Sequence, residues 1–311
     1  MWDKIVMTKK VGSDEADTII RVNHLEECAR GEQVYYQSTA YGNFENIFIH
    51  LKNDRVQVKC SLHKVWAKLT TGLLDNSRRF TMTDARVAMA MLMEHIGAGK
   101  EGWTVSYFEI GLNLRMDDEP IRYIEQVTGI RQEDGEREMF NDANWVKHHQ
   151  LTTERSRNFK KVMKIYDKTW EAREKKRKDV DERVLRIETI YKRQKVPVEE
   201  FISEAFGRRL ASRFMRDWLR LEWRRYMEAE KGMKQSQIDK ARRIIEIGTE
   251  AYMEECRRLY MERRMTKKAW ETCRTFARSW PSIADKFTMA EGPHEREYRN
   301  KFRTEYQAIN N

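Results

Sequence analysis

Three short stretches of the chain carry residue types that together could do chemistry on a phosphate ester. KIYDK puts a tyrosine between two lysines, and YFEIGLN and RIE each contribute a glutamate. A phenol with a pKa of about 10 is a weak nucleophile unless a cation or metal stabilises its anion. Carboxylate oxygens suit Mg²⁺ or Mn²⁺, and cationic side chains offset charge on phosphate oxygens. The residues predicted for these roles are Tyr166 as nucleophile, Lys164, Lys168 and Arg186 at the phosphate, and Glu109, Glu188 and Asn113 at the metal.

The alternation of residue types places these groups on one face of a sheet. Side chains two apart on a strand share a face, so each stretch separates into an apolar set and a polar set. Glu and Asn are depleted in strands, and a solvated face gives no reason to surround a phenol with cations. An ordinary solvated face of an antiparallel sheet is the alternative. The polar sets are Tyr107, Glu109, Gly111 and Asn113 in residues 103–116, Lys164, Tyr166 and Lys168 in 160–168, and Arg186 and Glu188 in 183–191.

The elements that must position these residues follow from the hydrophobic pattern. The stretch IFIHLKNDRVQVKCSL predicts a hairpin that turns at Asn53 and Asp54. Helix formers predict a helix over 83–96, and strict alternation predicts a central strand over 103–116. After Pro197 apolar residues recur at helical spacing, and a second long helix is expected over about 236–263. The pattern is typical of an α+β domain over residues 1–196, followed by an all-helical domain over residues 197–311.

Net charge favours a polyanionic partner. The formal net charge is +10, and residues 151–195 alone hold sixteen Lys or Arg against eight Asp or Glu. The surplus surrounds Tyr166, which makes nucleic acid the leading partner. The run EAREKKRK directly after the tyrosine is predicted to contact a phosphate backbone, with a solvated helix face as the alternative. The cations of that run are Lys175, Lys176, Arg177 and Lys178.

Composition excludes several classes of protein. No stretch approaches the roughly 18 uninterrupted apolar residues needed to span a bilayer. The opening MWDKIVMTKKVGSDEAD lacks the apolar run of a signal peptide. The four cysteines are scattered without CxxC or Cys/His pairing, as expected of reduced thiols. We therefore expect a cytoplasmic protein with no membrane partner.

Several motifs resemble a known family when they are taken in order. They are MWDKIVM, VQVKCSLHKVW, YFEIGLNL, IYDK and LRIE. This order is similar to that of the phage and plasmid rolling-circle replication initiators, which include the filamentous-phage initiators and the staphylococcal plasmid Rep proteins. The resemblance covers roughly residues 1–195.

The resemblance implies a relaxase-like fold with a central antiparallel sheet, acting on a plasmid or phage origin. Tyr166 matches the nicking tyrosine, which would form a phosphotyrosyl bond to one end of the cut strand and leave a free 3′-hydroxyl as primer. Glu109 and Glu188 match the acidic positions associated with the metal. Ser61 and Lys64 fall in a family motif for which contact with the DNA backbone is expected. The expected partners are single-stranded and duplex origin DNA, with a host helicase or polymerase and a homodimer as further options.

The sequence also departs from related relaxases. These use a His-hydrophobic-His metal motif, and no HxH occurs in this chain. The nearest candidates, His148 and His149, are adjacent and would point to opposite faces of a strand. A non-catalytic DNA-binding protein therefore stays open as an alternative. A tyrosine recombinase fits less well, because its catalytic Arg/His framework normally precedes a tyrosine near the C-terminus.

Overall fold

Two compact units make up the chain. The computed structural model describes residues 2–39, 46–74, 80–99, 101–133, 135–138, 140, 149–156, 158–176 and 182–310. Unit 1 comprises Met1–Glu222 and Glu297–Asn311, and unit 2 comprises Trp223–Arg296. This division differs from the boundary expected after residue 196, because about 25 residues beyond that point and the C-terminal segment belong to unit 1.

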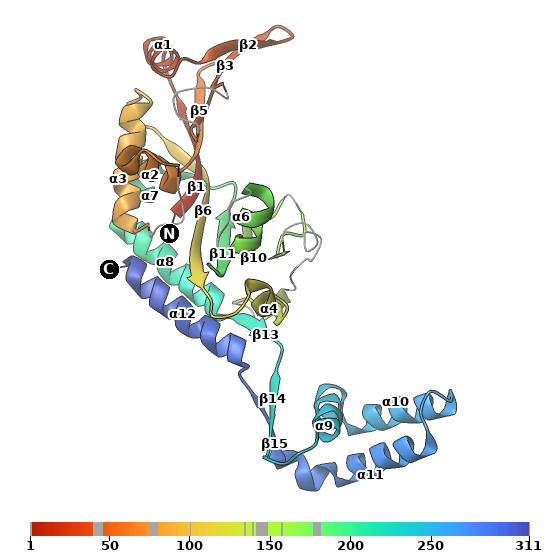
Figure 1. The fold of residues 1–311 in the computed structure, drawn as a ribbon. Helices are drawn as coiled ribbons and strands as arrows, with labels where there is room; N and C mark the ends of the chain where they lie inside the picture. The colour runs from red at the N-terminus through yellow and green to blue at the C-terminus, as the bar shows by residue number, and fades with distance from the viewer. Residues whose placement is uncertain are drawn as a thin grey trace. The chain divides into compact units, whose positions relative to one another are not determined.

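A large antiparallel sheet organises unit 1 (Figure 1). Its strand order is β2-β3-β4-β5-β1-β6-β11-β10-β9, with β12 also paired to β6. This arrangement confirms the expected α+β class with a central antiparallel sheet. The strands are β1 (Trp2–Lys10), β2 (Glu26–Arg30), β3 (Gln33–Gln37), β4 (Phe48–Lys52), β5 (Arg55–Ser61), β6 (Thr104–Arg115), β9 (Gln150–Thr152), β10 (Lys161–Asp167), β11 (Val184–Tyr191) and β12 (Val196–Pro197).

Local sequence explains the two best-defined connections around the sheet. The β4–β5 hairpin turns at Asn53 with a positive φ of 53°, which asparagine tolerates better than most residues. The predicted hairpin is therefore confirmed. Helix α3 (Met82–His95) begins at a capping box in which Thr81 and Asp84 satisfy each other's backbone N–H groups. Ser61 caps α2 (Leu62–Thr71) by accepting a hydrogen bond from the Lys64 N–H.

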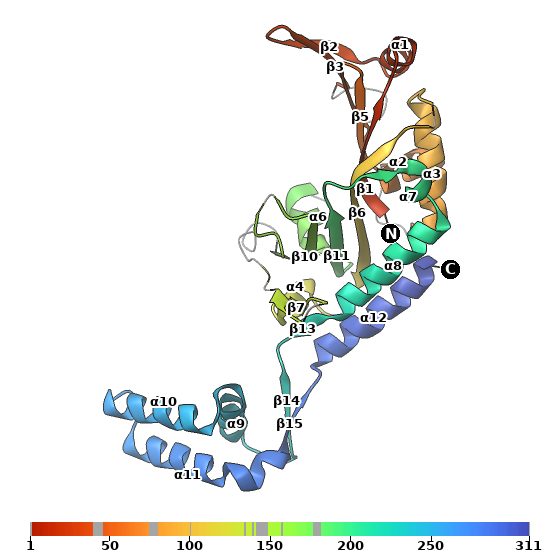
Figure 2. The ribbon, with the colours of Figure 1, turned by 180° about the vertical axis from the view of Figure 1, so that it is seen from behind.

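Helices α7 (Val198–Phe201), α8 (Glu204–Leu219) and the C-terminal α12 (Pro293–Asn310) lie along one face of the sheet (Figure 2). On this face the indole of Trp218 donates to the Thr189 hydroxyl at 3.0 Å, inside the core. Trp2 stacks on Phe201 with ring centroids 4.3 Å apart. Burial of these large side chains leaves the opposite face of the central strands for polar groups.

Further elements of unit 1 lie outside the large sheet. A small second sheet has the order β13-β7-β8. Within the described ranges, no helix combines the length and apolarity needed to cross a bilayer. These elements are α1 (Ser13–Val22), α4 (Pro120–Ile124), β7 (Val127–Arg131), β8 (Arg137–Glu138), α6 (Lys168–Lys176) and β13 (Leu221–Trp223).

Unit 2 packs three helices around its own core, with a two-stranded ladder of β14 and β15. The single helix expected over 236–263 is wrong: Gly248, with φ 86°, separates two helices there. The left-handed backbone at this position favours glycine, so the break is encoded locally. The elements are β14 (Tyr226–Ala229), α9 (Gln235–Ile247), α10 (Thr249–Met261), α11 (Lys267–Ile283) and β15 (Phe287–Ala290).

Candidate active site

Three adjacent central strands bring the predicted polar residues together. Across the β10–β11 ladder Tyr166 lies opposite Arg186, and across β11–β6 Arg186 lies opposite Asn113. Glu188 is two residues further along β11 and therefore shares that face. The Tyr166 hydroxyl donates to Glu188 Oε1 at 3.0 Å. The parity argument thus placed these groups correctly relative to one another.

Arg186 is the centre of the hydrogen-bond network. Its side chain is only 7% exposed, and its three nitrogens donate to three different partners. Nε donates to Glu188 Oε1 at 3.0 Å, Nη1 to Asn113 Oδ1 at 3.0 Å, and Nη2 to Asp3 Oδ2 at 3.2 Å. A planar guanidinium is suited to this geometry because its donors point in fixed directions.

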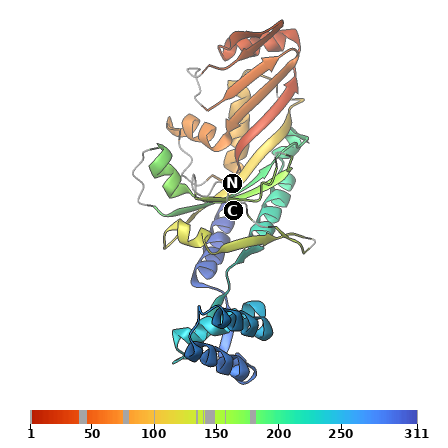
Figure 3. The same cartoon turned by 90° about the vertical axis from the view of Figure 1, so that its right-hand side faces the viewer.

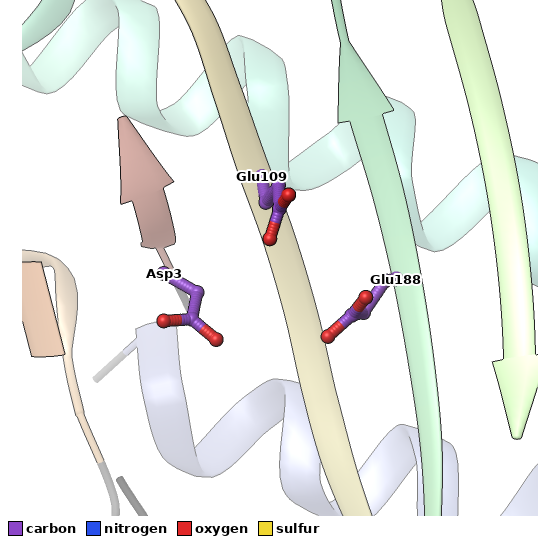
Figure 4. Close-up of side chains that lie close together, drawn as sticks. All are labelled: Asp3, Glu109 and Glu188. Carbon is purple, nitrogen blue, oxygen red and sulfur yellow. The ribbon is translucent and has the colours of Figure 1, made fainter. Parts of the chain in front are cut away.

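Asp3, Glu109 and Glu188 form a group of three carboxylates on β1, β6 and β11. One oxygen from each lies within 4.8 Å of the others. Figure 4 shows the three carboxylates pointing toward one another from neighbouring strands. Glu109 also accepts a hydrogen bond from Tyr107 and lies 4.0 Å from Lys4 Nζ.

A bulge in β1 explains why Asp3 reaches this group. Trp2 pairs with Ile110 and Ile5 with Phe108, so β1 has one residue more than β6 in this interval. Asp3 bonds to Arg186, and Lys4 lies near Glu109, although consecutive residues of a regular strand point to opposite faces. Regular alternation would put Asp3 on the face of Ile5, so the sequence pattern alone does not identify Asp3 as a member of this group.

Gly111 lets the network lie close to the sheet. It is opposite Glu188 in the β6–β11 ladder. A Cβ at this position would lie 2.6 Å from the Ile187 carbonyl and 2.9 Å from both Arg186 Nη2 and Glu188 Cγ. Only glycine therefore permits Arg186 to lie flat between the carboxylates.

The pKa shifts of the ionisable groups in the site differ in direction. Burial would raise the pKa of Asp3, but Arg186 and a 2.5 Å hydrogen bond from the Ser61 hydroxyl hold it below its usual value. Burial and the charge of Glu188 raise the pKa of Glu109. Burial and Glu188 also raise the pKa of Tyr166 well above its usual value, so Tyr166 is a neutral phenol at pH 7.

The donor set fits a divalent cation. Hard carboxylate oxygens are the ligands that Mg²⁺ and Mn²⁺ prefer, and three of them converge here. Burial and the neighbouring Glu188 both disfavour the charge of Glu109 and raise its pKa. A cation between the two would relieve that repulsion. Asp3, Glu109 and Glu188 are the residues that would hold it.

The other predicted site residues, Asn113, Lys164 and Lys168, lie around the carboxylate group. The amide oxygen of Asn113 accepts from Arg186 and, at 3.3 Å, from Lys168, so cationic side chains already surround it. Lys168 begins helix α6 instead of extending β10. Lys164 lies opposite Glu188 in the ladder. Asp3 therefore takes the third carboxylate position, and Asn113 contacts cations of the protein.

The predicted histidines and the predicted DNA-contacting cations lie partly outside the residues that the structure describes. His148, Arg177 and Lys178 lie outside the described residues, and for Lys175 and Lys176 only the backbone at the end of α6 is described. The ring of His149 packs on Trp170 with centroids 4.6 Å apart, and among the described residues no histidine joins the carboxylate group. Lys64 lies on α2, one turn after Ser61.

Comparisons with known proteins give a similar solved structure but no related sequence. No family model and no curated protein sequence matches the chain. A solved structure described as the rolling circle replication initiator protein from Geobacillus stearothermophilus is similar to it. The similarity covers 76% of this chain and 89% of that chain, with 11% sequence identity and a TM-score of 0.40.

Glu109→Gln is expected to raise the midpoint of thermal unfolding at pH 7 in EDTA. A group whose folded pKa is raised stabilises the fold while protonated, and that stabilisation is lost as pH rises through the folded pKa. The glutamate charge is therefore unfavourable at neutral pH without metal, and the amide removes it. The same variant should lose the increase in midpoint that Mn²⁺ gives to the wild type. Circular dichroism melts in EDTA and in Mn²⁺ measure both effects.

Glu27→Gln is the matched control, since exposed Glu27 accepts a hydrogen bond from Tyr36 at 2.9 Å outside the site. It should change neither the midpoint in EDTA nor the response to Mn²⁺. A Glu109→Gln protein that is less stable in EDTA and still responds fully to Mn²⁺ would disprove the assignment of Glu109 as a ligand.

Proposed function

We propose that the chain is a metal-dependent DNA-nicking enzyme that initiates rolling-circle replication at a plasmid or phage origin. The observation that carries the proposal is the 3.0 Å hydrogen bond from the Tyr166 hydroxyl to Glu188, a member of the three-carboxylate group. A potential nucleophile, a proton acceptor and a metal-binding group thus share one sheet face. The resemblance of the motif order to that of rolling-circle initiators supports the same function.

In the proposed reaction, the Tyr166 oxygen attacks the phosphorus of one phosphodiester. The P–O3′ bond breaks, and the 3′-oxygen takes a proton from solvent and becomes a free hydroxyl. Glu188 accepts the phenol proton, because its Oε1 already receives the hydrogen bond. A bound Mg²⁺ or Mn²⁺ would supply charge stabilisation at the phosphate oxygens.

Cations of the chain have distinct parts in this proposal. Arg186 orients Glu188 and Asp3, since it donates to both. Lys164 and Lys168 lie beside the site and would offset the charge of the phosphate. Lys168 is positioned by its hydrogen bond to Asn113. The product would be a phosphotyrosyl bond to the 5′ end and a 3′-hydroxyl that can prime synthesis.

The test is covalent attachment of single-stranded DNA to the protein. A random-sequence single-stranded library is labelled at either end and incubated with the full chain in Mn²⁺ or in EDTA, then run on a denaturing gel. The 3′ label should move with the protein only in Mn²⁺, and the 5′-labelled fragment should be extended by a polymerase. Equal adduct in EDTA and Mn²⁺ would refute the metal requirement, and free label in both would refute nicking.

The proposal extends to the cations expected along the DNA backbone. They are Lys64, Lys175, Lys176, Arg177 and Lys178. Changing the last four to glutamine should weaken binding of origin and non-origin DNA alike. It should also make the dependence of log affinity on log salt shallower by roughly 0.7–0.9 per lost phosphate contact. An unchanged slope over a salt series would mean that the run is a solvated face.

A non-catalytic DNA-binding protein is the second candidate. It is favoured by the pairing of Arg186 with two of the three carboxylates, which satisfies much of the network without a metal. Buried ion pairs of this kind also occur as structural features. This candidate predicts DNA binding with no covalent adduct under any metal condition.

A further inference from the structure

The face of the sheet that holds the carboxylates continues outward over strands β1, β5, β4 and β3. Residues directly opposite in an antiparallel ladder share a face, so the pairings define rows across these strands. Figure 3 shows these strands, red to orange, extending from the rest of the sheet. The rows are Phe48–Lys59–Val6–Tyr107, Gln37–His50–Gln57–Thr8 and Tyr35–Lys52–Arg55–Lys10.

This outer part of the face, named the strand platform, is open. Phe48 is 54% exposed although it is a large apolar side chain. Arg55, Gln57 and Lys59 are also exposed. The alternate residues of the same strands, such as Ile49 and Val58, are buried on the other side. The ring of Phe48 is thus accessible beside exposed cations and is available to stack on a base.

The charge of the strand platform suits a polyanion. Its rows contain Lys10, Lys52, Arg55 and Lys59. Two acids adjoin these rows: Glu26 of β2 lies opposite Gln37, and Asp54 in the turn lies 3.4 Å from Lys10. Aromatic rings are interleaved with the cations: Tyr35 lies against His50 with ring centroids 5.3 Å apart. Cations with exposed rings are the combination that binds single-stranded nucleic acid, by ion pairing and base stacking.

The strand platform joins the candidate active site without interruption. Tyr107 ends the first row and donates its hydroxyl to Glu109. Lys4, opposite Ser61, lies over the Tyr107 ring at 5.7 Å from its centroid. Five strand intervals of about 4.8 Å separate β4 from β10, and about 20 Å along β6 separates Tyr107 in the row of Phe48 from Asn113 in the row of Tyr166. Phe48 therefore lies on the order of 30 Å from Tyr166 along the sheet.

We propose that the strand platform binds the single-stranded DNA flanking the phosphate at Tyr166, with a base stacked on Phe48. The identity of the strand rests on the proposed function, whereas binding itself requires no cleavage. A duplex does not fit the ring of Phe48, because its bases are already stacked on one another. The exposed ring therefore selects unpaired bases.

The test measures binding of a labelled single-stranded oligonucleotide of about 12 nucleotides, within the site sizes of such proteins. Fluorescence anisotropy in EDTA excludes cleavage. Phe48→Ala should weaken binding about 5- to 100-fold, as loss of one stacked base does. Phe48→Tyr should restore most of the affinity. Binding of a duplex of the same length should change less than about twofold in either variant.

Val34→Ala is the matched control, because Val34 is 47% exposed and lies on the opposite face of the same strands. For the cations, Arg55→Gln with Lys59→Gln should make the salt dependence shallower by about 0.7 per lost contact. Arg21→Gln on α1 should leave it unchanged. Thermal melts verify that each variant is folded.

Equal losses of affinity for Phe48→Ala and Val34→Ala, or an unchanged affinity for Phe48→Ala, would overturn the strand platform. The result is separable from that of the nicking test. Weakened binding in Phe48→Ala without any covalent adduct in the wild type would support the surface and refute nicking. A normal adduct with unchanged binding in Phe48→Ala would refute the surface alone.

Discussion

Tyr166→Phe is expected to abolish covalent attachment of DNA, with a loss of at least about a thousandfold in adduct formation, while DNA affinity changes less than about twofold. The variant removes only the hydroxyl that would attack the phosphate, and loss of a nucleophile typically costs several orders of magnitude in rate. The ring and all neighbouring cations remain. Denaturing gels measure the adduct, and anisotropy in EDTA measures the affinity.

Tyr36→Phe is a close control for this variant. The Tyr36 hydroxyl also donates to a glutamate, at 2.9 Å to Glu27, but it lies on an exposed strand away from the carboxylates. It should leave adduct formation unchanged. If Tyr166→Phe formed as much adduct as the wild type, or if Tyr36→Phe lost it, the nucleophile would have to be sought elsewhere.

Arg186→Met should lower the stability of the metal-free protein by about 3–5 kcal/mol at pH 7, because it leaves Asp3 and Glu188 buried without their cation. For unit 1 this corresponds to a decrease of roughly 10 °C in the unfolding midpoint. Mn²⁺ should recover part of the loss, since a divalent cation can replace the guanidinium charge. Thermal melts in EDTA and in Mn²⁺ measure the loss of stability and its partial recovery.

The loss of stability in Arg186→Met should also depend on pH. The pKa of Asp3 is held below its usual value by Arg186 and Ser61, so this carboxylate stabilises the fold above its unfolded pKa of about 4. That contribution is lost as pH falls through the lower folded value. Without Arg186 the folded pKa of Asp3 should rise, and the difference between variant and wild type should shrink toward pH 4.

Arg209→Met is the control for Arg186→Met. Arg209 pairs with Glu200 at 3.2 Å, but both side chains are at least half exposed, so the pair should contribute less than about 1 kcal/mol. A loss in Arg186→Met no larger than in Arg209→Met would show that the carboxylates do not depend on the guanidinium. Equal melts of Arg186→Met in EDTA and Mn²⁺ would contradict metal binding there.

Alternation along strands was sufficient to predict the centre of the site. Tyr166, Arg186, Glu188 and Glu109 were placed on one face from parity, because regular strands carry that information in the order of residues. Gly111 was placed on the same face, and a glycine inside a strand indicates a close approach of this kind.

The other parts of the site could not be predicted, because they depend on irregular or long-range features of the fold. Asp3 reaches the site through a bulge in β1, and a bulge changes the face of a residue without any sign in the alternation. Lys168 was expected on the strand with Tyr166, yet the strand ends at Asp167 and Lys168 starts a helix. The role of Arg186 as the shared partner of two carboxylates required the pairing of β1, β6 and β11 in space.

The helical part of the chain was also predicted only where its features are local in sequence. Helical spacing predicted the apolar face of 236–263 but not the break at Gly248, because a glycine inside a helical pattern is tolerated at a cost of about 1 kcal/mol. The C-terminal α12 joins unit 1 by packing Tyr298 and Phe302 near α8. No local pattern shows that the last residues return to the first unit.

Mass spectrometry of the attached residue would show whether Tyr166 forms a covalent bond to DNA. The wild-type chain is reacted with single-stranded DNA in Mn²⁺, and the adduct is digested with nuclease and trypsin. The expected product is a nucleotide linked through phosphate to Tyr166 in the tryptic peptide Ile165–Lys168. A nucleotide on any other residue, with peptide 165–168 recovered unmodified, would contradict it.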